Sequence, residues 1–235
     1  MPTKTPLFLL PGLLCDSEVW RAQIDVLGRD RRVVSAEFLD PPSMEAMARA
    51  VLSFAPRRFA LAGHSMGGRV AMEVTRLAPE RVERLCLMDT GAHAVRNHEA
   101  VSRGELVAQA RAKGMEAMID SWLPPMVGEA GRADPALMGR LADMIRRGDP
   151  ELFARQQTAL LTRPDAEAHL HEIRCPTALI VGRQDGWSPV EQHEAMAALI
   201  PGATLTVIED CGHMAPMERP EAVTSALQDW LERDA

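Results

Sequence analysis

One serine of the chain lies in a setting that could make it a nucleophile. Ser65 stands in LAGHSMGGRV between Gly63 and Gly67, directly after an apolar run and directly before a helix-forming one. Gly-x-Ser-x-Gly is a weak signal when it stands alone, because Gly and Ser are common residues. On a sharp strand-to-helix turn, however, this spacing exposes the serine hydroxyl, and the two glycines let the flanking backbone approach closely. The N–H groups at the start of the following helix would then face the position where negative charge develops.

A serine hydroxyl needs a base near neutral pH, and the base in turn needs a carboxylate that orients it. His213, in the loop after the last apolar run, is the predicted base. Asp185 follows the preceding apolar run and is the predicted acid. Asp89 is the alternative acid, because it also follows such a run, whereas Asp210 is expected in a turn.

The other histidines are weaker candidates for the base. His64 belongs to the run that leads into Ser65, so its ring should point away from the hydroxyl and serve the structure. His93 follows a predicted strand and is the serious rival to His213. The chain has no tyrosine, which excludes a Tyr acid or a Tyr oxyanion donor. Polar helical stretches, expected at the surface, hold His98, His169, His171 and His193.

Short apolar runs of strand length alternate with longer amphipathic stretches, which is typical of a parallel sheet covered by helices. Because parallel strands end at the same edge of a sheet, side chains that follow different strands can meet there. The predicted strands are residues 6–11, 31–37, 58–64, 84–90, 177–182 and 204–209. The predicted helices between them are residues 17–28, 43–54, 67–78, 188–199 and 220–232.

The alternation is interrupted between about residues 93 and 170, where every pattern is helical. Asp134 and Asp149 each precede a proline, which is typical of a helix start with Asp as the N-cap. We therefore predict an α/β core of residues 1–92 and 171–235 with a helical cap, residues 93–170, inserted in it. The predicted cap is almost neutral and contains several methionines, which either form an apolar substrate pocket or only pack the cap.

Composition limits the class of protein. A chain of 235 residues with 46% hydrophobic residues fits one globular domain, with or without an insertion. The net charge of −7 argues against a nucleic-acid or membrane partner, and no apolar run approaches the ~20 residues of a membrane span. The four scattered cysteines show no metal-binding spacing and favour a reducing compartment, so we expect a cytoplasmic protein. No metal or other cofactor is expected.

The order Ser65, Asp185, His213, each after a successive strand of a predicted parallel sheet, resembles the α/β-hydrolase superfamily. The resemblance covers nearly the whole chain and implies a mostly parallel sheet of about six strands flanked by helices. The two leading strands of larger relatives have no counterpart here. A serine at this position argues against the dehalogenase and epoxide-hydrolase branches, which use an aspartate nucleophile.

The resemblance also implies an oxyanion hole made by the backbone N–H groups of Met66 and Leu13. The chain departs from the common pattern beside Leu13, because it has Pro11-Gly12 where many relatives have His-Gly. The donor is a backbone group, so this departure does not remove it. Trp187, two residues after the predicted acid, either lines the substrate pocket or packs under the acid loop.

These features lead us to expect a serine hydrolase that cleaves small to medium, largely apolar carboxylic esters through an acyl-enzyme. The alternatives are a carbon–carbon hydrolase or lyase, a hydrolase of thioesters, carrier-linked esters or lactones, and a ligand receptor that reuses the fold. The expected partner is a small-molecule ester. The sequence leaves the oligomeric state and the physiological substrate open.

Overall fold

The computed structural model describes residues 4–39 and 43–233, and at its centre lies a six-stranded sheet. All neighbouring strands are parallel, in the spatial order β2-β1-β3-β4-β5-β6. The predicted fold class and each predicted strand are confirmed. The strands are β1 (Leu7–Leu10), β2 (Val33–Ser35), β3 (Phe59–His64), β4 (Val82–Met88), β5 (Thr177–Gly182) and β6 (Thr204–Ile208).

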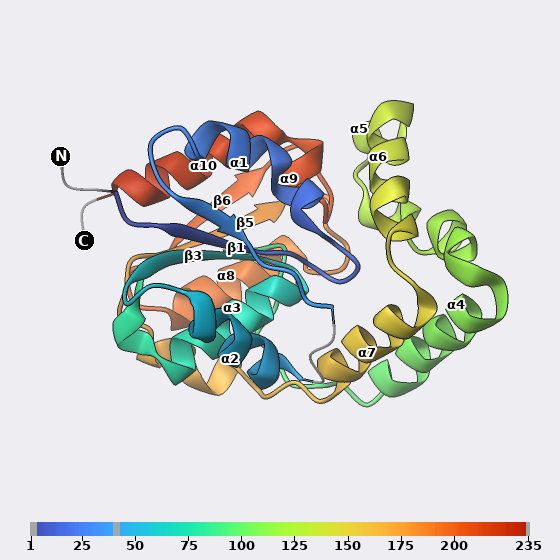
Figure 1. Ribbon diagram of the computed structural model, residues 1–235, viewed down its shortest axis with the longest axis horizontal. Coiled ribbons are helices and arrows are strands. Elements are labelled where there is room, and N and C mark those ends of the chain that lie inside the picture. The colour runs from blue at the N-terminus through green and yellow to red at the C-terminus, as the bar shows by residue number, and fades with distance from the viewer. Residues whose placement is uncertain (1–3, 40–42, 234–235) are drawn as a thin grey trace.

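Helices cover both faces of this sheet (Figure 1). The predicted helices outside the insertion are confirmed, although the first is divided into a 3-10 turn (Ser17–Trp20) and α1. One face carries α1 (Arg21–Leu27), α9 (Ala215–Glu218) and α10 (Pro220–Glu232). The other face carries α2 (Met44–Phe54), α3 (Met66–Leu77) and α8 (Val190–Leu199).

Three strands that lead into the loops of Leu13, Ser65 and Asp185 are completely buried. β1, β3 and β5 are buried along their whole length, as expected for parallel strands with helices on both faces. β4 lies two residues earlier than predicted, because Asp89 has a positive φ of 47° and leaves the extended conformation there. The edge strand β6 alternates between exposed and partly buried residues before its buried last residue.

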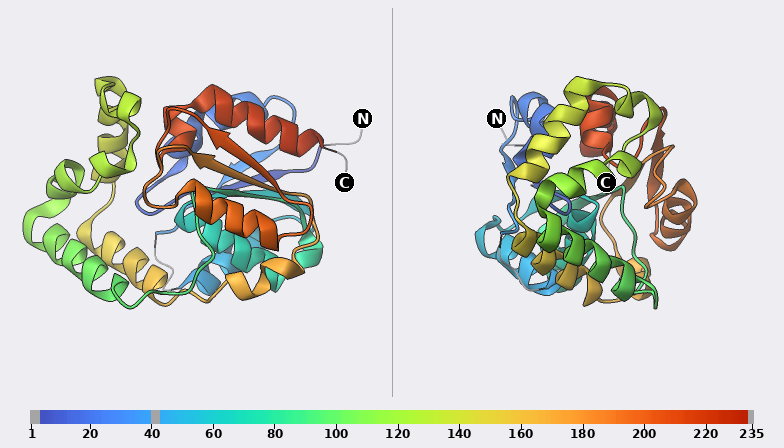
Figure 2. Two further views of the ribbon diagram at one scale, coloured as in Figure 1. Left: turned by 180° about the vertical axis from the view of Figure 1, so that it is seen from behind. Right: turned by 90° about the vertical axis from the view of Figure 1, so that its right-hand side faces the viewer.

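Between β4 and β5 the described chain forms only helices, and we call residues 93–170 the helical insertion. The Asp134 and Asp149 side chains accept N–H bonds from the first turns of their helices, so both predicted helix starts are confirmed. The insertion lies beyond the end of the sheet to which the arrowheads of β5 and β6 point (Figures 1 and 2). Its helices are α4 (Glu99–Ser121), α5 (Glu129–Arg132), α6 (Pro135–Arg146) and α7 (Pro150–Leu161).

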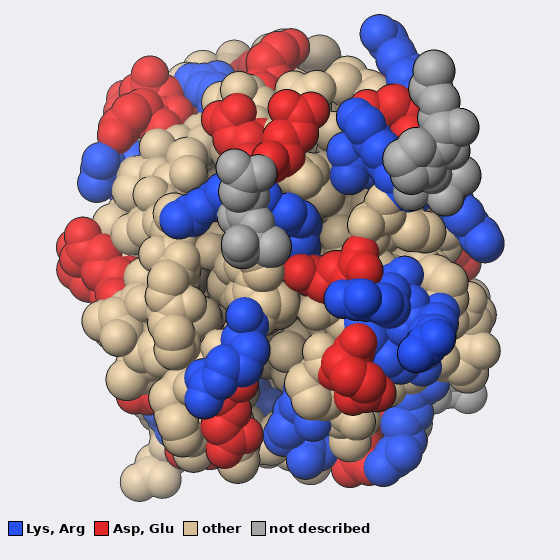
Figure 3. All heavy atoms as spheres, turned by 90° about the vertical axis from the view of Figure 1, so that its left-hand side faces the viewer, with Lys and Arg blue, Asp and Glu red and all other residues tan. Residues whose placement is uncertain are grey.

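The division into core and cap stays a prediction, and residues 1–3, 40–42 and 234–235 of the predicted core lie outside the described residues. On the face away from the insertion, acidic and basic side chains are interspersed (Figure 3). In the ranges that the structure describes, no helix is both long enough and apolar enough to cross a membrane.

Candidate active site

Ser65 lies on the turn between β3 and α3. Its backbone has φ 54° and ψ −115°, a strained conformation for a residue other than glycine. The turn is held on both sides: the Ser65 N–H donates to the Met88 carbonyl (2.8 Å), and the Thr90 hydroxyl donates to the Ser65 carbonyl (2.7 Å). A Cβ at Gly63 would lie 2.2 Å from the Gly67 carbonyl oxygen, so no side chain fits there. The turn therefore holds the Ser65 hydroxyl in one position.

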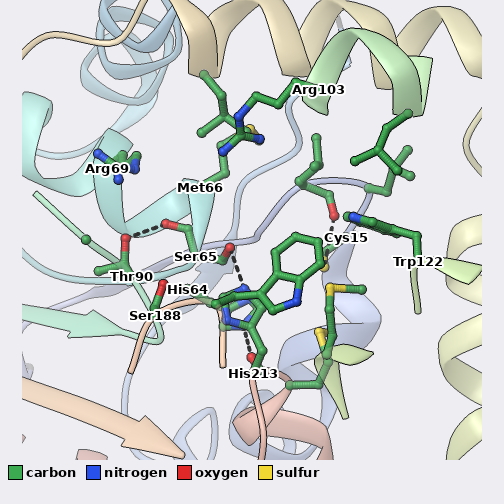
Figure 4. Close-up of a pocket in the computed structure, with 18 of the residues that line it drawn as sticks. Cys15, His64, Ser65, Met66, Arg69, Thr90, Arg103, Trp122, Ser188 and His213 are labelled. Carbon is green, nitrogen blue, oxygen red and sulfur yellow. Dashed lines mark hydrogen bonds between the residues drawn. The ribbon is translucent and has the colours of Figure 1, made fainter. Parts of the chain in front are cut away.

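His213, in the loop after β6, contacts both Ser65 and Asp185. Its Nε2 lies 2.8 Å from Ser65 Oγ (Figure 4) and its Nδ1 lies 2.8 Å from Asp185 Oδ2. Burial would raise the pKa of Asp185, but His213 and the backbone N–H groups of Trp187 and Ser188 outweigh burial and lower it. The ionised Asp185 accepts from Nδ1–H, so Nε2 is left to accept the Ser65 hydroxyl proton.

Asp89, the alternative acid, makes different contacts. Its Oδ1 accepts the Gly182 N–H (2.9 Å), and its Oδ2 has no hydrogen-bond partner within residues 4–39 and 43–233. Burial, followed by the nearby Asp185 carboxylate, raises the pKa of Asp89 well above its usual range. Asp210 is exposed in the turn after β6. The structure thus places Asp185, rather than either alternative, against His213.

His64 is buried beside Ser65 and His213, and it contacts the backbone of the loop that carries His213. Its Nε2 lies 2.7 Å from the His213 carbonyl oxygen, and the two imidazole rings are 5.3 Å apart. Burial, followed by the nearby His213, lowers the pKa of His64 to about 3, so the ring is neutral near pH 7. Through this contact His64 helps to hold the loop of His213 in place.

Among the described residues, none of the remaining histidines hydrogen-bonds to Ser65 Oγ. His93 contacts arginine side chains instead. The expectation for His193 was wrong: it is fully buried, and its Nε2 accepts the Thr90 N–H (3.1 Å), because α8 packs against the sheet and covers it. The other three are exposed, as predicted: His98, His169 and His171.

Two backbone N–H groups near Ser65 have no hydrogen-bond partner in the described parts of the chain. Met66 is the first residue of α3, where a helix has no internal acceptor for its N–H groups. Leu13 follows β1, and its N–H is also without a partner among the described residues. Both residues line the cavity that contains Ser65. Neither N–H group therefore has a protein acceptor within the described residues.

The loop after β1 lies directly against the Ser65 turn. A Cβ at Gly12 would come within 2.9 Å of His64 Nδ1 and 3.2 Å of Ser65 Cβ, so only glycine permits this approach. Leu14 has a positive φ of 57°, and its N–H donates to Gln156 Oε1 on α7 (2.9 Å). The loop after β1 thus approaches Ser65 closely even though it has Pro11 where many relatives have a histidine.

Two buried polar side chains that the sequence did not single out hold the loops of the site. Gln156 accepts from Leu14 and donates through Nε2 to the Phe38 carbonyl (2.8 Å), so it joins the insertion to two loops of the core. Glu218 accepts the N–H groups of Gly128 (2.7 Å) and of both neighbours of His213. Hydrophobic periodicity carries no signal for either residue. Glu218 stands close to His213 in the chain, and that proximity was the available clue.

A cavity of about 300 Å³ opens at Ser65 and His213 between the sheet and the helical insertion. Trp187 lines it, with its ring 5.6 Å from that of Trp122 in an edge-on arrangement. Of the two positions considered for Trp187, the structure shows the one in the pocket wall. Apolar side chains of the insertion form one side of the cavity: Leu123, Met126, Leu141, Met144 and Ile145.

Known proteins share this arrangement of elements. Residues 7–226 match the profile of the alpha/beta hydrolase family. A pimeloyl-[acyl-carrier protein] methyl ester esterase of Nitrosomonas europaea is 28% identical over 239 residues, which cover 94% of this chain and 93% of that protein. A 2-hydroxy-6-oxononadienedioate/2-hydroxy-6-oxononatrienedioate hydrolase of Escherichia coli is 29% identical over 181 residues, 74% of this chain and 62% of that protein.

Solved structures agree with these matches. A thermophilic esterase from Thermogutta terrifontis superimposes with a TM-score of 0.87 and 32% identity, over 97% of this chain and 90% of that one. The similarity extends through both the sheet and the insertion.

Proposed function

Because the chain belongs to the alpha/beta hydrolase family, we propose that it hydrolyses carboxylic esters through an acyl-enzyme on Ser65. The observation that carries the proposal is the continuous hydrogen-bonded line from Ser65 Oγ through the His213 ring to Asp185, with 2.8 Å at each step. A serine so placed has a base within reach, and the base is held in the tautomer that can accept a proton.

In the proposed first step, Ser65 Oγ attacks the ester carbonyl carbon and its proton passes to His213 Nε2. The carbonyl oxygen becomes an oxyanion, which accepts from the N–H groups of Leu13 and Met66. When the tetrahedral intermediate collapses, the bond to the alcohol oxygen breaks and that oxygen takes the proton from His213. Water then attacks the acyl-enzyme, gives a proton to His213, and releases the acid and Ser65.

The role of Asp185 in this proposal is electrostatic and orienting. Its carboxylate accepts from His213 Nδ1–H and stabilises the imidazolium that forms in each step. The backbone N–H groups of Trp187 and Ser188 hold the carboxylate in place. The helical insertion would act as a cap, since its side chains cover the reacting groups and restrict the size of the substrate.

A carbon–carbon bond hydrolase is the second candidate, because relatives named for each activity match this chain. Both reactions use a serine, a base and an oxyanion site, so the geometry supports both. Ester hydrolysis is preferred because the esterase matches extend over nearly the whole chain, whereas the chain covers 62% of the Escherichia coli relative.

A series of chromogenic esters with increasing acyl length tests the proposal. The wild type should turn over several of them, and Ser65→Ala should abolish turnover while Ser53→Ala, at an exposed serine of α2, leaves it unchanged. A fluorophosphonate should label the wild type at Ser65 and leave Ser65→Ala unlabelled. Labelling of Ser65 without turnover of any ester would favour the carbon–carbon hydrolase, and no labelling would contradict Ser65 as the nucleophile.

A further inference from the structure

The cavity at Ser65 has a basic end as well as an apolar side. Arg69 of α3 and Arg103 of α4 both line it (Figure 4), and Arg96 lines it beside them. Arg163 lies directly behind them, paired with Glu99. Four arginines thus gather around one carboxylate in a chain whose net charge is −7.

The Glu99 carboxylate already accepts hydrogen bonds from these arginines. Its two oxygens accept from the Arg163 guanidinium at 2.5 and 2.8 Å, from Arg103 Nε at 3.0 Å and from the Arg96 N–H at 3.0 Å. Burial would raise the pKa of Glu99, but these contacts outweigh burial and hold it well below its usual range. A carboxylate in this state balances Arg163 and leaves the charge of Arg69 uncompensated.

Within the described residues, the guanidinium of Arg69 hydrogen-bonds only to His93. It donates to the His93 carbonyl oxygen (3.0 Å) and to Nε2 of the ring (3.3 Å), and no carboxylate of the described residues lies within ion-pairing distance. Burial, followed by the positive charge of Arg163, lowers the pKa of Arg69 to about 9, so the guanidinium stays charged at neutral pH. A half-buried charge without a counter-ion is unfavourable, and a bound anion would relieve it.

Both guanidinium groups have donors left for a ligand. A guanidinium carries five N–H donors in a planar fork. Arg69 uses its two terminal nitrogens for His93, whereas Arg103 uses Nε for Glu99 and one terminal nitrogen for Gln157. The second terminal nitrogen of Arg103 has no hydrogen-bond partner in the described chain. A planar fork matches a carboxylate in geometry as well as in charge.

The subsite lies close to the reacting group. Arg69 follows Ser65 by four residues on α3, and the Arg69 N–H donates to the Ser65 carbonyl (3.4 Å). One helical turn separates the two backbones by about 6 Å. An anion on Arg69 would therefore be joined to a carbonyl at Ser65 by a short chain of a few carbons.

We propose that Arg69 and Arg103 form a subsite for a free carboxylate of the substrate, so that the enzyme hydrolyses esters that carry an acid group a few carbons from the reacting ester. This inference rests on the proposed ester hydrolysis and names its substrate class. The apolar side of the cavity, with Trp122 and Met144, takes the remaining part of the molecule.

Two matched pairs of esters test the subsite. The first pair is monomethyl glutarate and its neutral carboxamide, methyl 5-amino-5-oxopentanoate, followed by methanol release. The second pair is 4-acetoxybutanoate and 4-acetoxybutanamide, followed by acetate release, and it places the acid on the alcohol side. In at least one pair the wild type should prefer the anionic ester in kcat/KM by about ten-fold or more, as charge-assisted hydrogen bonds imply.

Substitutions assign that preference. Arg69→Gln should bring the ratio of anionic to neutral kcat/KM close to one, and Arg103→Gln should lower it. Arg69→Lys retains the charge and should keep part of the preference. Arg111→Gln, an exposed arginine of α4 paired with Glu151, is the matched control and should leave the ratio unchanged. Equal rates within both pairs, or a preference that Arg69→Gln does not change, would overturn the subsite.

A binding measurement separates the subsite from the proposed activity. Calorimetry with Ser65→Ala should detect glutarate but not the neutral pentanediamide, and adding Arg69→Gln should abolish glutarate binding. Arg69-dependent binding without hydrolysis of any ester would keep the subsite and contradict the esterase. Hydrolysis of the neutral esters without any Arg69-dependent preference or binding would keep the esterase and refute the subsite.

Discussion

The Nε2 atom of His64 lies 2.7 Å from the backbone carbonyl oxygen of His213. A carbonyl oxygen only accepts, so Nε2 of His64 carries the proton and the ring is a neutral donor. Its Nδ1 is buried without a hydrogen-bond partner in the described part of the chain. The last residue of β3 therefore positions the backbone of the residue that contacts Ser65.

The buried neutral His64 predicts a loss of stability in acid. The pKa of His64 is lowered to about 3 in the folded protein, whereas an unfolded histidine titrates near 6.5. Below pH ~6.5 the unfolded chain binds more protons, so His64 stabilises the fold fully above that pH and progressively less towards pH ~3. Between pH 7 and pH 5, protonation of His64 in the unfolded chain should lower the free energy of unfolding by about 2 kcal/mol.

Urea unfolding of the wild type and His64→Gln at pH 7 and pH 5 measures this difference. The variant should lose about 2 kcal/mol less than the wild type over the interval. The comparison uses the change with pH, so a uniform destabilisation of the variant does not affect it. Identical pH dependence in the two proteins would show that His64 is not the buried neutral group inferred here.

Asp185 and Asp89 should respond differently to the same substitution. Asp185→Asn removes the charge that holds the His213 tautomer, and kcat should fall about a thousand-fold or more. Asp89 Oδ1 accepts the Gly182 N–H, and an asparagine oxygen can still accept it, so Asp89→Asn should change kcat by less than about ten-fold. Ester hydrolysis by the two purified variants decides the assignment, and the reverse order of losses would make Asp89 the acid.

Gln156 should affect the rate more than substrate binding. It holds Leu14, whose neighbour Leu13 is a proposed oxyanion donor, so Gln156→Leu should lower kcat by about ten-fold or more with little change in KM. Gln156→Glu retains an acceptor for the Leu14 N–H and should recover part of kcat. Gln109→Leu is the control, because the side-chain hydrogen bonds of Gln109 to described residues stay within α4. Equal kcat values for Gln156→Leu and the wild type would show that the contact from α7 to Leu14 does not support the oxyanion site.

Glu218 should contribute to both stability and rate. Its carboxylate accepts the N–H groups of Gly212 and Met214, the two neighbours of His213. In Glu218→Gln an amide NH₂ would face these donors, so the unfolding free energy should fall by about 1–3 kcal/mol and kcat should fall with it. Glu221→Gln, at an exposed residue of α10, is the matched control. Denaturant unfolding and ester kinetics of both variants measure the effects; a Glu218→Gln protein as stable and active as the control would contradict this role.

Much of the fold followed from local patterns. Apolar runs of strand length, Asp-Pro helix starts and the glycines around Ser65 are short-range signals, because backbone sterics and burial act on neighbouring residues. The order of strands along the chain also predicted that Ser65, Asp185 and His213 would lie at one edge of the sheet. The distances of 2.8 Å between their side chains agree with that expectation.

Other relationships were decided only by the tertiary structure. Asp185 and Asp89 both follow strands, and only packing places Asp185 against His213 and Asp89 against the Gly182 N–H. His193 has a polar helical pattern, yet the sheet covers it. The contact of Gln156 with Leu14 and the gathering of arginines near Arg69 join segments that are far apart in the chain. Periodicity states which residues face inward; it cannot state which partner they meet, because that depends on how the helical insertion docks on the sheet.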